Sequence, residues 1–139
     1  PSKIMTPLMI GQQGACVLNV SSMSAFTPLT RIPGYSGAKA AVSNFTQWLA
    51  TYLARSGVRV NAIAPGFFMT EQNHALQFNP DGTPTPRCAH IVNGTPMRRY
   101  GELKELIGAM LFLVDERAAS FVTGVVLPVD GGYSAFSGV

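Results

Sequence analysis

At positions 58–66 the chain reads VRVNAIAPG, where an apolar run with a β-branched start is stopped by a Pro-Gly pair. This run predicts a strand. Working outward, ACVLNV at 15–20 is almost continuously apolar and predicts a strand that is buried on both faces. The run VVLPV at 125–129 predicts a third strand, and Pro128, which lacks a backbone N–H, places that strand at a sheet edge.

Between these runs the apolar residues recur with a helical period. From Ser36 to about Arg55 they follow three-four spacing, which predicts a helix ended by Gly57 with Trp48 in the core. The same spacing predicts a second helix over 103–114. Strands that alternate with amphipathic helices predict an α/β fold, a parallel sheet covered by helices. Because a three-stranded sheet is small for helices this apolar, we expect further strands in the full protein.

Composition limits the possible classes of protein. The chain has 139 residues, 47% hydrophobic and 12% charged, which fits one domain and excludes a disordered chain. The net charge is +3 and no basic run exceeds Arg98-Arg99, so no nucleic-acid partner is expected. No apolar run reaches the roughly 18 residues of a membrane span, and no secretory signal is visible. A disulfide between Cys16 and Cys88 stays possible, but a reducing cytoplasm is the simpler interpretation, and no metal site is expected.

The candidate chemistry lies in Tyr35-Ser36-Gly37-Ala38-Lys39. Tyrosine and lysine at i and i+4 share one face of a helix, and an ammonium there stabilises a phenolate. Alone, this spacing more often marks an ordinary surface pair. However, Ser22 follows the first predicted strand, and Pro65-Gly66 end the next one. Ligands of open parallel sheets bind at the carboxyl ends of strands, where these features converge.

The same motifs, in this order, resemble the signatures of the short-chain dehydrogenase/reductase family. The resemblance covers essentially the whole chain and rests on Asn19-Val20-Ser21-Ser22, Tyr35–Lys39, Asn61–Gly66, Thr123-Gly124 and Val129–Gly132. It implies the C-terminal half of a Rossmann-type, doubly wound parallel sheet. It also implies an oxidoreductase that moves a hydride between NAD or NADP, with NAD favoured, and a carbonyl or alcohol.

The resemblance also implies roles for individual residues. Ser22 would hydrogen-bond the substrate oxygen, with Ser21 as the competing candidate. Tyr35 would be the general acid/base, and Lys39 would favour the phenolate and bind the nicotinamide ribose. The implied cofactor-binding residues are Tyr35, Lys39, Pro65, Gly66, Phe68 and Thr70.

The glycine-rich loop of that family has no counterpart in this sequence. We therefore expect residues 1–139 to be a partial NAD(P)-binding domain, the catalytic half, which binds cofactor poorly and is inactive by itself. Residues 67–101 contain four prolines and predict a long irregular substrate loop, or lid.

The stretches Pro28–Pro33, Ser43–Ala50, Asn61–Asn73 and Gly131–Val139 resemble, at closer range, the D-mannonate oxidoreductase (fructuronate reductase) branch of the family. This resemblance implies a sugar-acid substrate. Such a substrate needs a cation for its carboxylate and donors for its hydroxyls. The candidates are Arg31, Gln72, Asn73 and Arg87. Gluconate 5-dehydrogenase-like or other polyol activity, 3-oxoacyl reduction, and an inactive assembly module remain alternatives. The resemblance further implies a homo-oligomer, often a tetramer. The lack of a long apolar run predicts no membrane partner.

Overall fold

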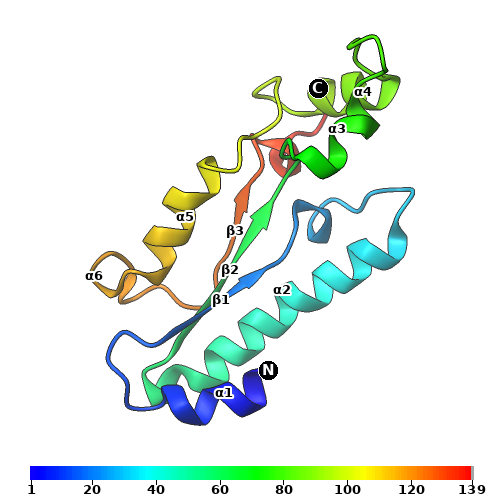
Figure 1. Ribbon diagram of the computed structural model, residues 1–139. Helices are drawn as coiled ribbons and strands as arrows, with labels where there is room; N and C mark the ends of the chain where they lie inside the picture. Colours follow the sequence, from blue (N-terminus) through cyan, green and yellow to red (C-terminus); the bar gives the residue numbers. More distant parts are fainter. Residues whose placement is uncertain (139) are drawn as a thin grey trace.

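The sheet at the centre of the molecule is parallel. The structure, a computed structural model, describes residues 1–138 apart from the side chain of Gln72. Within these residues the strands are β1 (Cys16–Val20), β2 (Arg59–Pro65) and β3 (Val126–Val129), in the spatial order β1-β2-β3 (Figure 1). Leu18 pairs with Asn61, and Ile63 pairs with Leu127. The predicted fold class is confirmed, and β3 lies at an edge as its proline requires.

Two helices cover this sheet. Figure 1 shows α2 (Pro33–Leu53) on one side of the sheet and α5 (Glu105–Val114) on the other. Pro33 begins α2 at a position where its missing N–H costs nothing. After α2, Gly57 adopts a left-handed conformation (φ 74°) and turns the chain into β2, as predicted. The remaining short elements are α1 (Ser2–Met9), η1 (Met23–Ala25), η2 (Ala54–Ser56), α6 (Glu116–Ala119) and η3 (Tyr133–Ala135).

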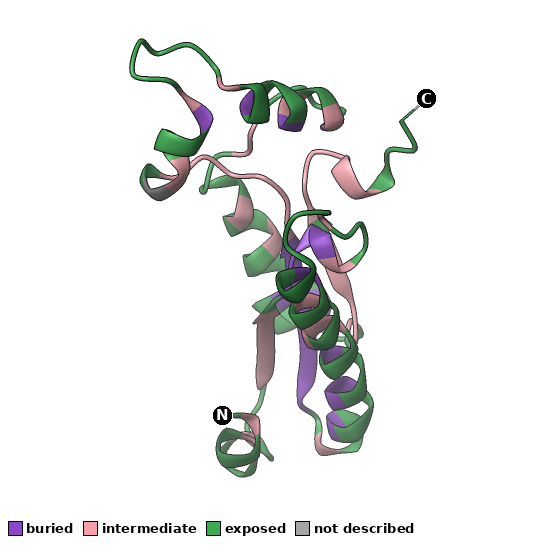
Figure 2. Ribbon diagram, turned by 90° about the vertical axis from the view of Figure 1, so that its right-hand side faces the viewer, coloured by how far each residue is buried: buried purple, intermediate pink, exposed green. Residues whose placement is uncertain are grey.

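The strands differ in how far they are buried. In β2, Arg59–Ala64 are all buried, and Val60 packs against Leu49 and Leu53 of α2 in the main core (Figure 2). In β1 the residues are only half-buried, and Val20 is 52% exposed. The prediction that 15–20 is buried on both faces is therefore wrong for this chain. The reason is that β1 pairs only with β2, so no strand lies along its other edge among the described residues.

Two buried polar side chains of β2 join this strand to the end of α5 and to the segment that precedes β3. The Arg59 guanidinium donates to the Leu113 and Val114 carbonyls at 2.8 and 3.2 Å, which satisfies the C-terminal end of α5. The Asn61 amide donates to the Val122 carbonyl at 2.9 Å and accepts from the Val125 N–H at 3.1 Å. These bonds fix the approach to β3.

The segment 67–101, called here the arm, is not irregular. It contains α3 (Glu71–Gln77) and α4 (Pro86–Gly94), which lie beyond the carboxyl ends of the strands (Figure 1). Each helix starts at a threonine whose hydroxyl accepts a backbone N–H, Thr70 for α3 and Thr85 for α4. The expectation of a loop without helices is wrong because these caps begin short helices between the prolines.

Trp48 also differs from expectation. It is 54% exposed on α2 and stacks between Phe45 and Tyr52, with ring centroids 5.7 and 5.1 Å away. Helical spacing put it on the apolar stripe, but only part of that stripe reaches the sheet.

Cys16 and Cys88 are free thiols. Among the described residues, no cluster of metal-binding side chains and no helix long and apolar enough to cross a bilayer is found.

Candidate active site

Ser22 is fixed at the carboxyl end of β1 by its own turn. Its backbone is extended (φ −162°), and its Oγ accepts the Ser24 N–H at 3.2 Å, which caps η1. The Ser24 hydroxyl donates to the same oxygen at 3.0 Å. Ser22 is 7% exposed and Ser24 1%, so both side chains are held in a buried, polar corner.

Ser21, the competing serine, is used differently. Its Oγ donates to the Lys39 carbonyl at 3.0 Å and lies 2.6 Å from the Ser43 Oγ. Both partners belong to α2, so these bonds fasten the end of β1 to the helix that carries Tyr35 and Lys39. The Ser21 hydroxyl is committed to this anchor, whereas the Ser22 hydroxyl has no partner on α2.

Tyr35 and Lys39 lie in the first turns of α2, beside the end of β1. The Lys39 Nζ donates to the Val20 carbonyl at 2.9 Å and lies 5.7 Å from the centroid of the Tyr35 ring. Tyr35 is 47% exposed, so its ring is open to solvent on one side. The residues Val20 to Ser24 with the first turns of α2 are called here the β1 end. It contains the three side chains that the sequence singled out, of which Lys39 and Tyr35 lie against each other.

The end of β2 is built for close backbone approach. The Gly66 N–H donates to the Val129 carbonyl at 2.9 Å, directly after Pro65 pairs with Val129. A Cβ on Gly66 would lie 2.6 Å from the Asp130 Cα, so only glycine fits. The Asp130 carboxylate accepts two N–H groups and one hydroxyl from the η3 turn at 2.6–2.9 Å, and this holds Asp130 in place.

The next residues, Phe68 and Thr70, are braced by Asn73. The Asn73 amide accepts the Thr70 N–H at 3.1 Å and donates to the Phe68 carbonyl at 2.8 Å. The Thr70 Oγ1 in turn accepts the Asn73 N–H at 3.2 Å. The Phe68 ring packs so closely on Gly101 that a Cβ there would lie 2.5 Å from it. Asn73, expected to contact substrate, thus faces its own loop.

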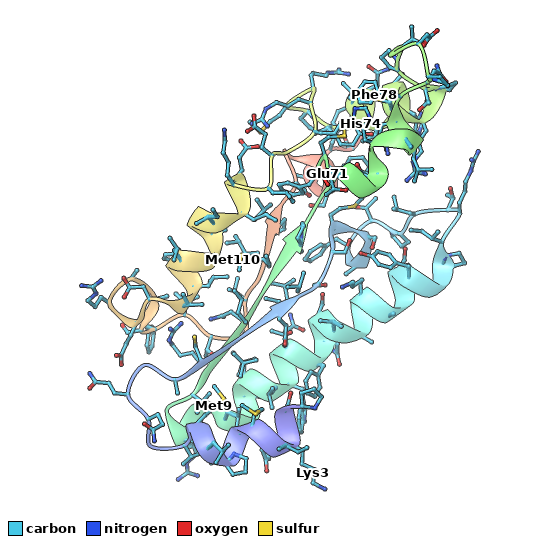
Figure 3. All side chains as sticks on the ribbon, in the orientation of Figure 1. Lys3, Met9, Glu71, His74, Phe78 and Met110 are labelled. Atoms are coloured by element: carbon cyan, nitrogen blue, oxygen red, sulfur yellow. The ribbon has the colours of Figure 1, made fainter. Side chains whose placement is uncertain are left out.

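The other expected substrate residues are not brought together. Arg31 is exposed in the loop before α2, and Arg87 is exposed in the first turn of α4. Neither guanidinium makes an ion pair within residues 1–138. Gln72 belongs to α3, but its side chain lies outside the described part. The His74 ring of α3 lies tilted against the ring of Phe78, which caps the helix, with ring centroids 4.7 Å apart (Figure 3).

Tyr100 is a half-buried contact of the arm that the sequence did not single out. Its hydroxyl donates to the Gln77 Oε1 at 2.6 Å, which joins the end of the arm to α3. Burial, and then the neighbouring Cys88 thiol of α4, raise the pKa of the Tyr100 phenol well above its usual range. The raised pKa agrees with a protonated phenol that donates to Gln77. No local sequence motif predicts this contact, because the partners of Tyr100, Gln77 and Cys88, belong to two separate helices.

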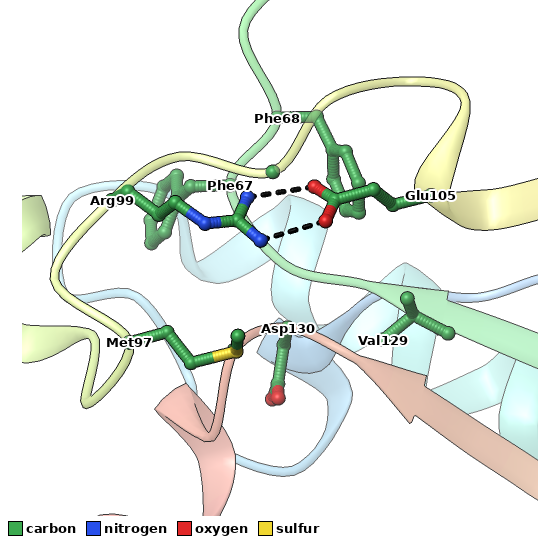
Figure 4. Close-up of a pocket in the computed structure, with 9 residues that line it drawn as sticks. Phe67, Phe68, Met97, Arg99, Glu105, Val129 and Asp130 are labelled. Atoms are coloured by element: carbon green, nitrogen blue, oxygen red, sulfur yellow. Dashed lines mark hydrogen bonds and ion pairs between the residues drawn. The ribbon is translucent and has the colours of Figure 1, made fainter.

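A hollow lies beside the arm, at the carboxyl ends of β2 and β3. Arg99 and Glu105 form a two-pronged ion pair across it, with N–O distances of 2.7 and 2.6 Å (Figure 4). Its other lining residues are Phe67, Phe68, Met97, Gly101, Val129, Asp130 and Gly131. Ser22, Tyr35 and Lys39 do not line it, and the ion pair neutralises its one arginine. Ser22, Tyr35 and Lys39 therefore lie at the β1 end, whereas Phe68 and the motif residues Val129, Asp130 and Gly131 lie around this hollow.

A parallel α/β sheet with polar side chains at the carboxyl ends of its strands is the architecture in which open α/β folds bind their ligands, dinucleotides among them. The family described as Enoyl-(Acyl carrier protein) reductase matches residues 2–134. The chain belongs to the short-chain dehydrogenase/reductase family, whose members depend on nicotinamide cofactors.

Individual relatives agree with this membership. An uncharacterized oxidoreductase of Haemophilus influenzae is 60% identical over all of this chain and 49% of its own length. A solved structure from Haemophilus influenzae, provisionally named a D-mannonate oxidoreductase, holds NAD. It is 60% identical with a TM-score of 0.96, covering 100% of this chain and 50% of its own. A gluconate 5-dehydrogenase of Burkholderia cenocepacia, solved with NADP and tartrate, is 32% identical with a TM-score of 0.80, covering 97% and 51%. The chain thus spans about half the length of these relatives.

Proposed function

We propose that the protein containing this chain transfers a hydride between a nicotinamide cofactor and a sugar acid, with D-fructuronate and D-mannonate as the favoured pair. The observation that carries the proposal is the place of the Lys39 ammonium, which lies against the Tyr35 ring and on the Val20 carbonyl. Ser22 lies two residues after Val20, at the same strand end. A proton donor, a cation and a hydroxyl thus belong to one end of the sheet.

Each side chain has a defined task in this proposal. The cofactor, when bound, supplies or accepts the hydride. As the substrate carbonyl becomes an alkoxide, Tyr35 donates its phenolic proton to that oxygen, and the reverse transfer serves oxidation. Ser22 donates a hydrogen bond to the same oxygen and stabilises its developing charge. Lys39 stabilises the phenolate that Tyr35 leaves behind.

The residues of the β1 end and the end of β2 have donors that fit the nicotinamide half of the cofactor. A lysine ammonium has three N–H donors, and Lys39 gives one to Val20, which leaves two for ribose hydroxyls. The Thr70 hydroxyl accepts one bond and keeps its own hydrogen to donate. Pro65, Gly66 and Phe68 complete the proposed contact. We favour NAD because the 60% identical solved relative holds it.

The chain alone is proposed to be inactive, since no glycine-rich phosphate-binding loop occurs in its sequence. A gluconate 5-dehydrogenase-like reaction is the second candidate, because a relative of that name is solved with tartrate, a small hydroxy acid. In the proposal Arg31 or Arg87, both exposed and unpaired within residues 1–138, would meet the substrate carboxylate. The free thiols of Cys16 and Cys88 favour the cytoplasm.

We also propose that the full protein is a homo-oligomer, a tetramer in the family's usual form. The support is apolar surface on both covering helices, with Trp48 and Tyr52 exposed on α2 and Ile107 and Leu111 exposed on α5. Light scattering of the full protein tests this, and a monomer at micromolar concentration contradicts it.

The test of the activity uses the full-length protein that contains this chain. It is mixed with NADH or NADPH and D-fructuronate or 5-keto-D-gluconate, and the nicotinamide absorbance is followed. The expected result is faster oxidation of NADH with D-fructuronate. Faster turnover of 5-keto-D-gluconate would move the assignment to the second candidate. No turnover of either compound, or of D-mannonate and D-gluconate with the oxidised cofactors, would overturn the sugar-acid proposal.

A further inference from the structure

The hydroxyl of Ser22 receives two hydrogen bonds from a single residue. The Ser24 N–H and the Ser24 hydroxyl both donate to the Ser22 Oγ, at 3.2 and 3.0 Å. The N–H bond alone is the ordinary cap of a short turn. The hydroxyl bond needs a serine two residues on, and Ser24 is 1% exposed, so water does not compete for it.

These two bonds decide what the Ser22 hydroxyl can still do. A serine oxygen has two acceptor lone pairs and one O–H donor. With both lone pairs occupied by Ser24, the remaining capacity of Ser22 is its O–H. Ser21 provides the contrast, because its Oγ donates to the Lys39 carbonyl and pairs with Ser43, so its hydrogen is already engaged.

We propose that Ser24 is a positioning residue that keeps the Ser22 hydroxyl a hydrogen-bond donor toward the reacting oxygen. The proposal rests on the function proposed above. Hydrogen bonds in a chain polarise one another, so a Ser22 oxygen that accepts two bonds donates a stronger one. That donor is worth most when the substrate oxygen is an alkoxide, hence in the transition state. Ser24 moves no proton; Tyr35 does.

Without the Ser24 hydroxyl, the Ser22 oxygen should keep its position, but the orientation of its O–H would no longer be fixed. The N–H cap still fixes the oxygen, while one lone pair is free and the hydroxyl hydrogen can rotate. The expected consequence is a lower kcat with little change in the KM for substrate or cofactor, because ground-state binding does not depend on the stronger bond.

The experiment is a double-mutant cycle in the full-length protein with the substrate that it turns over. Ser24→Ala is expected to lower kcat by about three- to tenfold, with the thermal midpoint and the pH profile of kcat almost unchanged. In a Ser22→Ala background the same substitution should have no further effect, since Ser24 acts only through Ser22. Thr46→Val is the control, because it removes a 0% exposed hydroxyl of α2 that bonds Asn19 and Val42 and does not contact Ser22.

The outcomes separate this inference from the function on which it rests. If Ser22→Ala lowers kcat but Ser24→Ala does not, the positioning role is wrong and the catalytic assignment stands. An equal loss from Ser24→Ala with and without Ser22 indicates a general structural effect and also overturns it. If Ser22→Ala matches the wild type, the proposed role of Ser22 fails, and the inference fails with it.

Discussion

The β1 end and the arm lie at the same edge of the sheet but are held by different forces. At the β1 end, small hydroxyls are buried and bonded at 2.6–3.2 Å to one another and to the backbone of α2. The arm is held by a few larger contacts, such as Tyr100 on Gln77 and Phe67 on Tyr133, and its arginines are exposed. In the proposed function, the first arrangement would fix atoms for the chemistry, and the second would leave a surface that can differ between substrates. Changes at the β1 end should therefore alter kcat, and changes in the arm should alter KM.

The largest effect is expected from Tyr35→Phe at the β1 end. It removes the proposed proton donor and leaves the ring beside Lys39, so kcat should fall by about 10²–10⁴-fold. The measurement is steady-state turnover by nicotinamide absorbance in the full-length protein. Tyr52→Phe is the matched control, since Tyr52 lies on the same helix with its ring 68% exposed and stacked on Trp48. A loss of similar size in both variants would remove Tyr35 from the chemistry.

Gly66→Ala tests whether the junction between the two regions tolerates a side chain. Its Cβ would lie 2.6 Å from backbone and side-chain atoms of Asp130, so the chain must shift there. We expect a loss of about 1–3 kcal/mol in unfolding free energy, together with weaker cofactor binding. Denaturant titration and cofactor fluorescence measure the two effects.

Gly108→Ala, in α5 with nothing within 4 Å of its Cβ, is the control for the same substitution. It should stabilise the protein by up to about 1 kcal/mol because alanine is the better helix residue. Equal stability changes of the same sign in the two variants would contradict the close approach at Gly66.

The two regions also differ in how much the sequence reveals. The strands and α2 follow from apolar runs and three-four spacing, and the left-handed Gly57 from its place after the helix. The motif residues of the β1 end are local to one strand and one helix, so a sequence places them together. The helix caps of the arm are also local sequence signals, at Thr70 and at Thr85-Pro86. The prolines near them, however, favour a loop, so the sequence gives two opposing signals there.

Other features depend on contacts that no spacing encodes. Tyr100 meets Gln77 across the arm, and whether Trp48 is core or surface depends on how much sheet lies under α2. The half-buried state of β1 depends on neighbours that the chain does not supply. The second bond of Ser24 to Ser22 needs the turn geometry of η1, although a serine two residues after a strand-end serine is a visible signal for such a turn.

Tyr100→Phe tests the other half of the comparison. It leaves the 2% exposed Gln77 without its phenol donor, which should cost about 1 kcal/mol of local stability in the arm. Substrate KM should rise about three- to tenfold, with kcat nearly unchanged. Tyr133→Phe is the control, because its hydroxyl makes no hydrogen bond within the described residues while its ring packs on Phe67. A fall in kcat at constant KM would mean that the arm takes part in the chemistry.

The smallest effect is expected from lowering the pH, which should weaken the Arg99–Glu105 ion pair between the arm and α5. The two hydrogen bonds from Arg99, followed by the Glu102 N–H, lower the pKa of Glu105 from 4.5 to about 2. A carboxylate with a lowered folded-state pKa stabilises the fold fully above its unfolded pKa, and that contribution is lost as the pH falls from about 4.5 toward 2.

Glu105→Gln should thus lower the thermal midpoint slightly at pH 7, with the difference from wild type vanishing near the folded pKa. Because both side chains are substantially exposed, salt should reduce the difference. A Glu105→Gln difference that persisted unchanged to low pH would mean that packing, and not charge, ties the arm to α5.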